Sequence, residues 1–205
     1  MSPNNVKLNK TVRRVFSPYI AELASRISSC SGMMFQRCLD IGCGRGELGL
    51  AMAYLHKMQV HLMDISEEAL YAARKGIMRL GLQDSASVEV GDVHDIPFED
   101  GFFDMVVSRG AVWFWGNHVN AFKEIHRVLA YGGTAYIMGG LTRDELQKCM
   151  DRKRDISDMD WKERIKRFTG ENSVERFTLA LSRTGIANFE VSEQEEGVVI
   201  TVRKE

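Results

Sequence analysis

The sequence predicts an α/β protein with a doubly wound, mostly parallel sheet of seven strands. Two observations support this fold class. Short apolar runs alternate along most of the chain with amphipathic helical stretches, and the chain ends in two apolar runs joined by a short loop. Alternation of this kind is typical of a parallel sheet covered by helices on both faces. The closing pair predicts a hairpin, so the last strand is expected to be antiparallel to its neighbour.

The expected strands are short apolar runs that end in small or polar residues. Five precede the hairpin, at 37–41, 59–63, 87–90, 103–107 and 134–138, and the hairpin strands are 189–192 and 198–202. Runs of this length, bounded by turn residues, are typical of buried strands rather than helices.

Helices are expected between these strands. Ser66 can cap a helix that has Glu67 and Glu68 in its first turn and Gly81 after its last, an order that suits the helix dipole. Two further helices are expected at 119–129, with Gly132-Gly133 as its stop, and at 173–184.

Length and composition indicate one globular domain over residues 1–205, since 44% of the residues are hydrophobic and 27% are charged. Residues 1–30 are expected to form an N-terminal helical cap. Residues 142–170 are expected to form a helical insertion or lid, because this charged segment follows a strand whose carboxyl end should face the ligand. No apolar run approaches the length of a membrane span, and no secretory leader is found.

Charge and cysteine content narrow the classes of partner and compartment. The formal net charge of −1 gives no general bias toward nucleic acid or anionic membranes. The four cysteines do not fall at zinc-ligand spacing, so free thiols in a reducing cytoplasm are expected and no metal site is.

The clearest chemical signal is a glycine cluster directly after the first expected strand. Gly42, Gly44 and Gly46 lie between that strand and a helix, where glycine allows a positive φ and lets a ligand approach the backbone. Asp40, near the strand end, could accept a hydrogen bond from a cationic ligand group. A second frame, Gly44, Gly46 and Gly49, formally satisfies the dinucleotide fingerprint, with Asp64 lying 20 residues after Gly44.

Four further segments strengthen the first frame. LDIGCGRG at 39–46 is followed by an acid at the end of the second strand, by GDVHDIPF at 91–98, by FFDMVVS at 102–108 and by FKEIHRVL with YGG at 122–133. In this order they resemble the motifs of class I S-adenosylmethionine-dependent methyltransferases of the small-molecule type. The resemblance covers about residues 37–140, and Arg45 and Tyr131 depart from the usual pattern.

The resemblance implies a Rossmann-like methyltransferase fold and S-adenosyl-L-methionine as the cofactor. It implies that Asp64 accepts from the ribose hydroxyls, that Asp92 and Val93 meet the adenine edge, and that Ile65 covers the adenine face. The implied cofactor-binding residues are Asp40, Gly42, Cys43, Gly44, Gly46, Asp64, Ile65, Asp92, Val93 and Ser108.

The acceptor side is less defined. Arg109, Trp113, Trp115 and Tyr19 are candidate acceptor contacts, and Phe114 lies in the same aromatic run. Each could have a structural role instead, and ordinary packing is favoured for Tyr19. His94 is expected to be a loop residue. No catalytic residue is assigned, because methyl transfer needs a general base only when the acceptor arrives protonated and weakly acidic.

Several functions remain compatible with these motifs. The leading hypothesis is methyl transfer to a small molecule. The alternatives are a protein or RNA methyltransferase, a nicotinamide oxidoreductase using the second glycine frame, and a non-catalytic S-adenosylmethionine-binding regulator. Nucleic acid is not expected as a partner, because no RNA-binding module is visible and Ser108-Arg109-Gly110-Ala111 stands where an NPPY-type motif would lie. The acceptor atom and the oligomeric state are not predicted.

Overall fold

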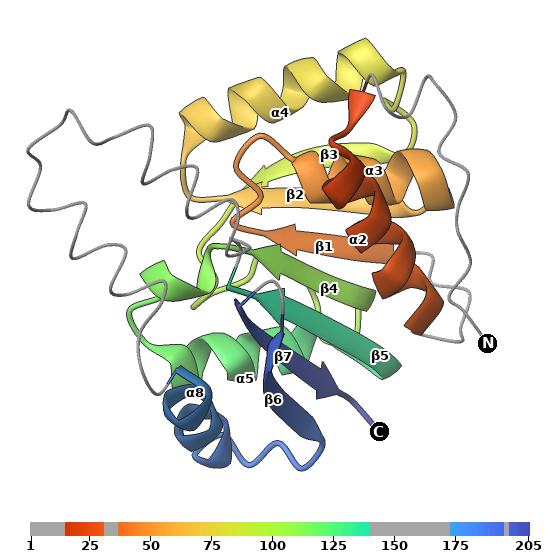
Figure 1. The fold of residues 1–205 in the computed structure, drawn as a ribbon. Helices are drawn as coiled ribbons and strands as arrows, with labels where there is room; N and C mark the ends of the chain where they lie inside the picture. Colours follow the sequence, from red (N-terminus) through yellow and green to blue (C-terminus); the bar gives the residue numbers. More distant parts are fainter. Residues whose placement is uncertain (1–14, 31–36, 140–172, 195–196) are drawn as a thin grey trace, which may run out of the picture.

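The computed structural model describes residues 15–30, 37–139, 173–194 and 197–205. They form one seven-stranded sheet with helices on both faces (Figure 1). The strands are β1 (Arg37–Ile41), β2 (Gln59–Asp64), β3 (Ala86–Val90), β4 (Phe103–Arg109), β5 (Leu129–Met138), β6 (Phe189–Gln194) and β7 (Gly197–Arg203).

The strand order confirms the predicted topology. It is β3-β2-β1-β4-β5-β7-β6. The five strands from β3 to β5 are parallel, whereas β7 is antiparallel to both β5 and β6. The chain order reverses between β1 and β4, and ligands of open α/β sheets bind outside the carboxyl ends of the strands at such a reversal.

Two cores lie on opposite faces of the sheet because alternate strand residues point to opposite sides. Cys38 and Met105 pack on the face covered by α2 (Pro18–Cys30), α3 (Glu47–His56) and α4 (Glu67–Leu80). Leu39 and Val106 pack on the face covered by α5 (His118–Val128) and α8 (Ser173–Ser182). A short 3-10 helix, η1 (Val112–Phe114), follows β4.

Both caps expected for α4 are confirmed. Ser66 Oγ accepts a hydrogen bond from the backbone N–H of Ala69 at 3.2 Å, and Gly81 ends α4 with a left-handed φ of 65°. At the start of α5, the Asn117 side chain accepts from the backbone N–H of Asn120.

The fifth strand begins earlier than the sequence indicates. Gly132-Gly133, expected to stop the preceding helix, lies inside β5, and the register against β4 shifts between Phe103 and Met105. A Cβ atom on Gly133 would lie 2.8 Å from the Ala130 carbonyl oxygen and 3.0 Å from that of Asp104. The glycine pair therefore permits a close approach of backbone segments at an irregularity in the strand. The glycines alone do not show whether they end a helix or serve such an irregularity.

Parts of the predicted domain organisation lie outside the described residues. Of the expected cap over 1–30, the structure describes only 15–30, where α2 packs on the α3 face, and the expected lid at 142–170 is not described. None of the helices within the described ranges is both long and apolar enough to cross a membrane.

Candidate functional site

A cleft of about 600 Å³ lies at the carboxyl end of the sheet. Its lining comes from the loops that follow β1, β2, β3 and β4, together with Gly139 at the end of β5. The cleft therefore lies where the strand order reverses, and its volume is in the range of small-molecule sites.

The loop after β1 folds back toward β2. Gly42, Gly44 and Gly46 have φ values of 64°, 55° and 78°, which only glycine adopts without strain. A Cβ atom on Gly42 would lie 2.3 Å from Ala111 Cβ in the loop after β4, whereas one on Gly44 would meet nothing within 4 Å. The first glycine thus lets two loops meet, and the second leaves open space.

Asp64 holds this loop in place. Its Oδ2 accepts from the backbone N–H of Gly44 at 2.8 Å, and its Oδ1 accepts from that of Ser66 at 2.9 Å. Each carboxylate oxygen has a second lone-pair direction, so Asp64, which lines the cleft, can still accept hydrogen bonds from a ligand.

Asp40 lies beneath the glycine loop with 1% of its surface exposed. Its Oδ2 accepts from the backbone N–H of Gly49 at 2.9 Å, but its buried Oδ1 has no hydrogen-bond partner among the described residues. Burial, with a smaller contribution from the charge of Asp64, raises the pKa of Asp40 to about 7, although the Gly49 bond and Arg109 oppose this. Asp40, Cys43 and Arg109 line a pocket of about 150 Å³.

The other end of the cleft is formed by the segment after β3. Asp92 Oδ1 accepts from the backbone N–H of His94 at 2.9 Å, and the same oxygen lies 2.6 Å from His94 Nδ1. The bond from the His94 N–H is the main reason that the pKa of Asp92 is lowered. Val93 lines the cleft beside this carboxylate.

Two large apolar side chains are exposed where they border the cleft. Ile65 is 73% exposed and Phe114 is 63% exposed, and they come from the β2 and β4 sides of the cleft. Exposed apolar side chains around a concave site with a few carboxylates are the usual composition of a small-molecule site.

The structure brings only some of the predicted site residues to the main cleft. Gly42, Asp64, Ile65, Asp92, Val93, Arg109 and Trp115 line it. Asp40 and Cys43 line the adjoining small pocket, and Gly44 contributes its N–H to Asp64. Tyr19 lies on α2, with its ring centroid 5.2 Å from the Arg109 guanidinium carbon.

Three predicted residues lie away from the cleft lining. Ser108 is buried and its Oγ donates to the Ile41 carbonyl at 2.8 Å, which joins β4 to β1. Trp113 is buried, donates from Nε1 to the Gly139 carbonyl at 2.7 Å and packs against Phe177. Gly46 is also buried, and its missing Cβ makes room for Leu62.

Sequence reasoning missed Ala111 and Gly139, and it expected His94 to be a loop residue, yet all three line the cleft. Phe114, the middle residue of the aromatic run, also lines it. Arg45, the departure noted in the glycine loop, is exposed and lines a separate cleft of about 560 Å³ between α2, α3 and α4.

No group of three or more His, Cys, Asp or Glu residues is arranged to hold a metal in the parts of the chain that the structure describes. Burial raises the pKa of the Cys43 thiol, and the nearby carboxylates raise it further. Cys43 is therefore a protonated thiol beside the cleft rather than an activated nucleophile.

Comparison with known proteins identifies the family. A family model described as a methyltransferase domain matches residues 39–137. A solved structure from Methanococcus maripaludis, provisionally assigned as an S-adenosyl-L-methionine-dependent methyltransferase, is 34% identical, with a TM-score of 0.81 and coverage of 100% of this chain and 97% of that one. This chain is an S-adenosylmethionine-dependent methyltransferase family member. The membership confirms the predicted family and its cofactor class.

Curated relatives match a smaller part of this methyltransferase family member. Ajmaline N-methyltransferase of Rauvolfia serpentina is 34% identical over 106 residues, which are 52% of this chain and 36% of that protein. The 2-methyl-6-phytyl-1,4-hydroquinone methyltransferase 1 of Oryza sativa is 30% identical over 104 residues, 50% of this chain and 30% of that protein. The matched region spans about a third of each of these relatives.

The sheet topology argues against the nicotinamide oxidoreductase alternative. Dinucleotide-binding sheets of the Rossmann type commonly have the order 3-2-1-4-5-6. In this methyltransferase family member the antiparallel β7 lies between β5 and β6. The second glycine frame also has a structural explanation, because a Cβ on Gly49 would lie 2.4 Å from Leu62 Cδ2 and 2.9 Å from Asp40 Oδ2.

Proposed function

We propose that this protein transfers a methyl group from S-adenosyl-L-methionine to a small-molecule acceptor. The observation that carries the proposal is the order of three carboxylates across neighbouring strands: Asp40 in β1 at the small pocket, Asp64 at the end of β2, and Asp92 after β3. S-adenosylmethionine presents an ammonium, two ribose hydroxyls and an adenine amino group in the same order, and each is a hydrogen-bond donor.

The hydrogen-bond donors of the cofactor match acceptor positions that the carboxylates leave open. The unpartnered Oδ1 of Asp40 is a buried acceptor that a ligand cation would satisfy, and such a cation would favour the ionised form of this carboxyl group. Asp64 retains acceptor capacity beyond its two backbone bonds. Ile65 offers an exposed apolar face to a planar base.

When bound, S-adenosylmethionine supplies a methyl group on an electrophilic sulfonium. The residues of this chain then have to align the acceptor and exclude water, which is how a displacement of this kind is accelerated. Arg109, Phe114 and Trp115 lie on the β4 side of the cleft, where the acceptor is expected. An arginine with aromatic walls suits a flat, partly anionic small molecule better than a polymer.

Titration calorimetry with S-adenosylhomocysteine, S-adenosylmethionine and NADH tests the proposal. We expect micromolar binding of the first two and none of NADH. Tight binding of NADH without S-adenosylhomocysteine would overturn the assignment. If the protein binds S-adenosylmethionine but forms no S-adenosylhomocysteine with any of a panel of aromatic acids, RNA and peptides, the non-catalytic regulator is favoured. If only a polymer is methylated, the small-molecule acceptor is excluded.

Asp64→Ala should weaken S-adenosylhomocysteine binding by about 1–3 kcal/mol, the scale of a lost hydrogen bond to a charged group. The matched control is Ser66→Ala, which removes the Ser66 cap of α4 but leaves the cleft carboxylates in place. The control should lower the melting temperature without changing the affinity. Equal affinities of the Asp64 variant and the wild type would remove Asp64 from the ribose site.

A further inference from the structure

The His94 side chain lies between Asp92 and the beginning of α5. Its Nδ1 lies 2.6 Å from Asp92 Oδ1, and its Nε2 lies 3.1 Å from the backbone nitrogen of Asn117. The Asn117 N–H can only donate, so Nε2 must accept and carries no proton. The proton of the neutral imidazole therefore lies on Nδ1 and is donated to Asp92.

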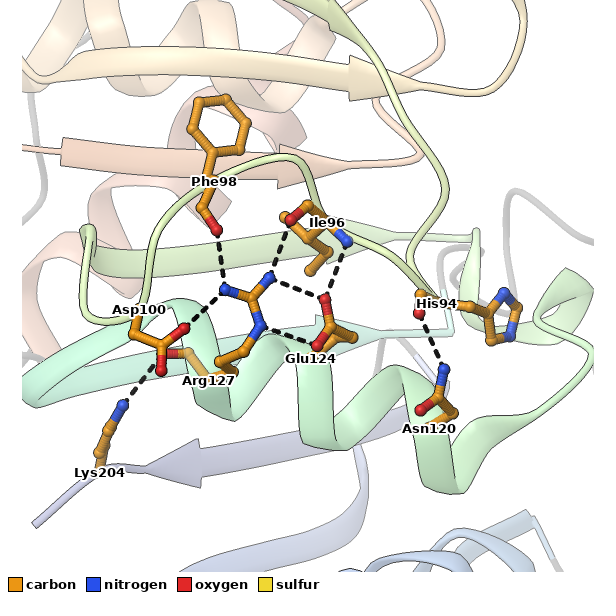
Figure 2. A network of polar contacts seen from close by, with 8 residues as sticks. All are labelled: His94, Ile96, Phe98, Asp100, Asn120, Glu124, Arg127 and Lys204. Carbon is orange, nitrogen blue, oxygen red and sulfur yellow. Dashed lines mark hydrogen bonds and ion pairs between the residues drawn. The ribbon is translucent and has the colours of Figure 1, made fainter.

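A second bond joins the same two segments. Asn120 Nδ2 donates to the His94 carbonyl at 2.8 Å (Figure 2). Asn117 is the N-cap of α5 and Asn120 lies in its first turn, two and five residues after Trp115, which lines the β4 side of the cleft. His94 thus links the carboxylate expected at the adenine to the beginning of the helix that follows the aromatic wall.

We propose that His94 is a positioning residue that fixes Asp92 for the adenine amino group and couples the adenine end of the cleft to the aromatic wall. The inference rests on the proposed function, because it assumes that the adenine of S-adenosylmethionine meets Asp92. It concerns a residue for which the resemblance implies no role.

The geometry supports a positioning role. Half of the Asp92 side chain is exposed, so without a partner the carboxylate would sample several rotamers. Two donors from His94 converge on Oδ1, which fixes the side chain and leaves Oδ2 available for a ligand donor. Fixing an acceptor before the ligand arrives removes an entropic cost from binding.

Two substitutions separate the two bonds of the imidazole. In His94→Asn, the side-chain amide nitrogen can occupy the position of Nδ1 and donate to Asp92, but nothing reaches Asn117. In His94→Gln, the amide oxygen can occupy the position of Nε2 and accept from Asn117, but the donor to Asp92 is lost. His94→Ala loses both, while the backbone bonds of residue 94 remain in all three variants.

The experiment measures S-adenosylhomocysteine affinity by calorimetry and exchange protection of the Asn117 amide by NMR. We expect His94→Asn to bind within about 2-fold of the wild type, whereas His94→Gln and His94→Ala bind about 3- to 10-fold more weakly, the scale of one hydrogen bond. Asn117 protection should show the complementary pattern, kept in His94→Gln and lost in the other two. In an Asp92→Ala background, His94→Gln should no longer change the affinity.

The outcomes distinguish this inference from the proposed function. If the wild type does not bind S-adenosylhomocysteine, the proposed function fails and the inference fails with it. If the wild type binds and the three variants behave alike in both measurements, only the role of His94 is overturned. If His94→Gln weakens S-adenosylhomocysteine binding equally with and without the Asp92 carboxylate, His94 does not act through that carboxylate.

Discussion

Asp40 is the residue at which ligand binding and stability conflict. Its carboxyl group is buried and has one backbone donor, so burial raises its pKa to about 7, although an exposed aspartate titrates near pH 4. Between these two pH values the folded protein binds more protons than the unfolded chain. The free energy of unfolding therefore falls as the pH rises through this window.

Asp40→Asn should remove this penalty because the amide oxygen still accepts from the Gly49 N–H. At pH 8 the variant should have the higher melting temperature, with a free energy of unfolding up to about 4 kcal/mol above that of the wild type. At pH 5 this difference should shrink to about 1.5 kcal/mol, because the folded carboxyl group is then protonated. Thermal melts at both pH values measure this difference. The same variant should bind S-adenosylhomocysteine more weakly.

A variant that is less stable than the wild type at pH 8 would contradict this account of Asp40. Asp84→Asn, in the loop before β3, serves as the control for loss of a carboxylate and should show no such pH dependence. Stability gained without loss of affinity would mean that the unpartnered oxygen of Asp40 does not meet the ligand.

At the scale of single residues, the acids were predictable and the aromatics were not. Asp64 was placed because a polar residue that ends a parallel strand lies at the carboxyl edge of the sheet. Trp113 and Ser108, both predicted site residues, do not line the cleft because each turns inward and donates to a carbonyl, that of Gly139 and that of Ile41. The residues next to a side chain in the sequence do not show which backbone carbonyl it will meet, because that depends on the folded structure.

The loop between β3 and β4 is held against α5 by one arginine. The Arg127 guanidinium donates to Glu124, to Asp100 and to the carbonyls of Ile96 and Phe98, each at 2.8 Å (Figure 2). The backbone N–H of Ile96 in turn donates to Glu124 Oε2. Hydrogen bonds from Arg127 lower the pKa of Glu124, so this carboxylate remains ionised well into acid.

Arg127→Lys should destabilise the protein by about 2 kcal/mol, because an ammonium group cannot replace a planar fork with several fixed donors. Urea unfolding at pH 7 measures the loss. The difference from the wild type should shrink as the pH falls through the lowered pKa of Glu124, since the protonated acid no longer attracts either cation.

Arg79→Lys, an exposed exchange on α4, is the matched control and should change stability by less than about 0.5 kcal/mol. If both substitutions lower the free energy of unfolding equally, the hydrogen bonds of Arg127 contribute no more to stability than those of an ordinary surface arginine.

Elements were predictable where local chemistry and packing agree. The α4 helix has a serine cap, acids in its first turn and a C-terminal glycine, and the structure confirms each end within a residue. The β5 strand was predicted to begin at residue 134 but begins at Leu129. Pairing with β4 extends it through Gly132-Gly133, and long-range pairing of this kind leaves no periodic signal in the strand itself.

At the scale of the molecule, the two halves of the sheet meet between β1 and β4. Ser108 Oγ joins the strands through the Ile41 carbonyl, and Gly42 contacts Ala111 just beyond their ends. The topology was predictable because the hairpin and the order of motifs allow few arrangements. The roles expected of residues 1–14 and 142–170 concern segments outside the described residues.

Gly42→Ala should be more destabilising than Gly44→Ala. Both glycines have a positive φ, so both substitutions carry a backbone cost of about 1–2 kcal/mol. Only the Cβ at position 42 would also lie 2.3 Å from another atom, Ala111 Cβ. Melting temperatures of the two variants test this order, and equal losses would mean that the two loops separate freely.

The η1 segment gives the protein a built-in optical reporter. The protein has three tryptophans, and two of them, Trp113 in η1 and Trp115 just after it, are two residues apart but lie in different surroundings. Trp115 lines the cleft, whereas the indole of Trp113 is hydrogen-bonded to Gly139 and covered by Phe177. A ligand in the cleft should therefore alter the emission of Trp115 and leave that of Trp113 nearly constant. In a Trp161→Phe background, which removes the third tryptophan, Trp115→Phe should abolish the ligand-dependent fluorescence change and Trp113→Phe should retain it. Acceptor candidates can then be screened by light emission without knowing which atom receives the methyl group.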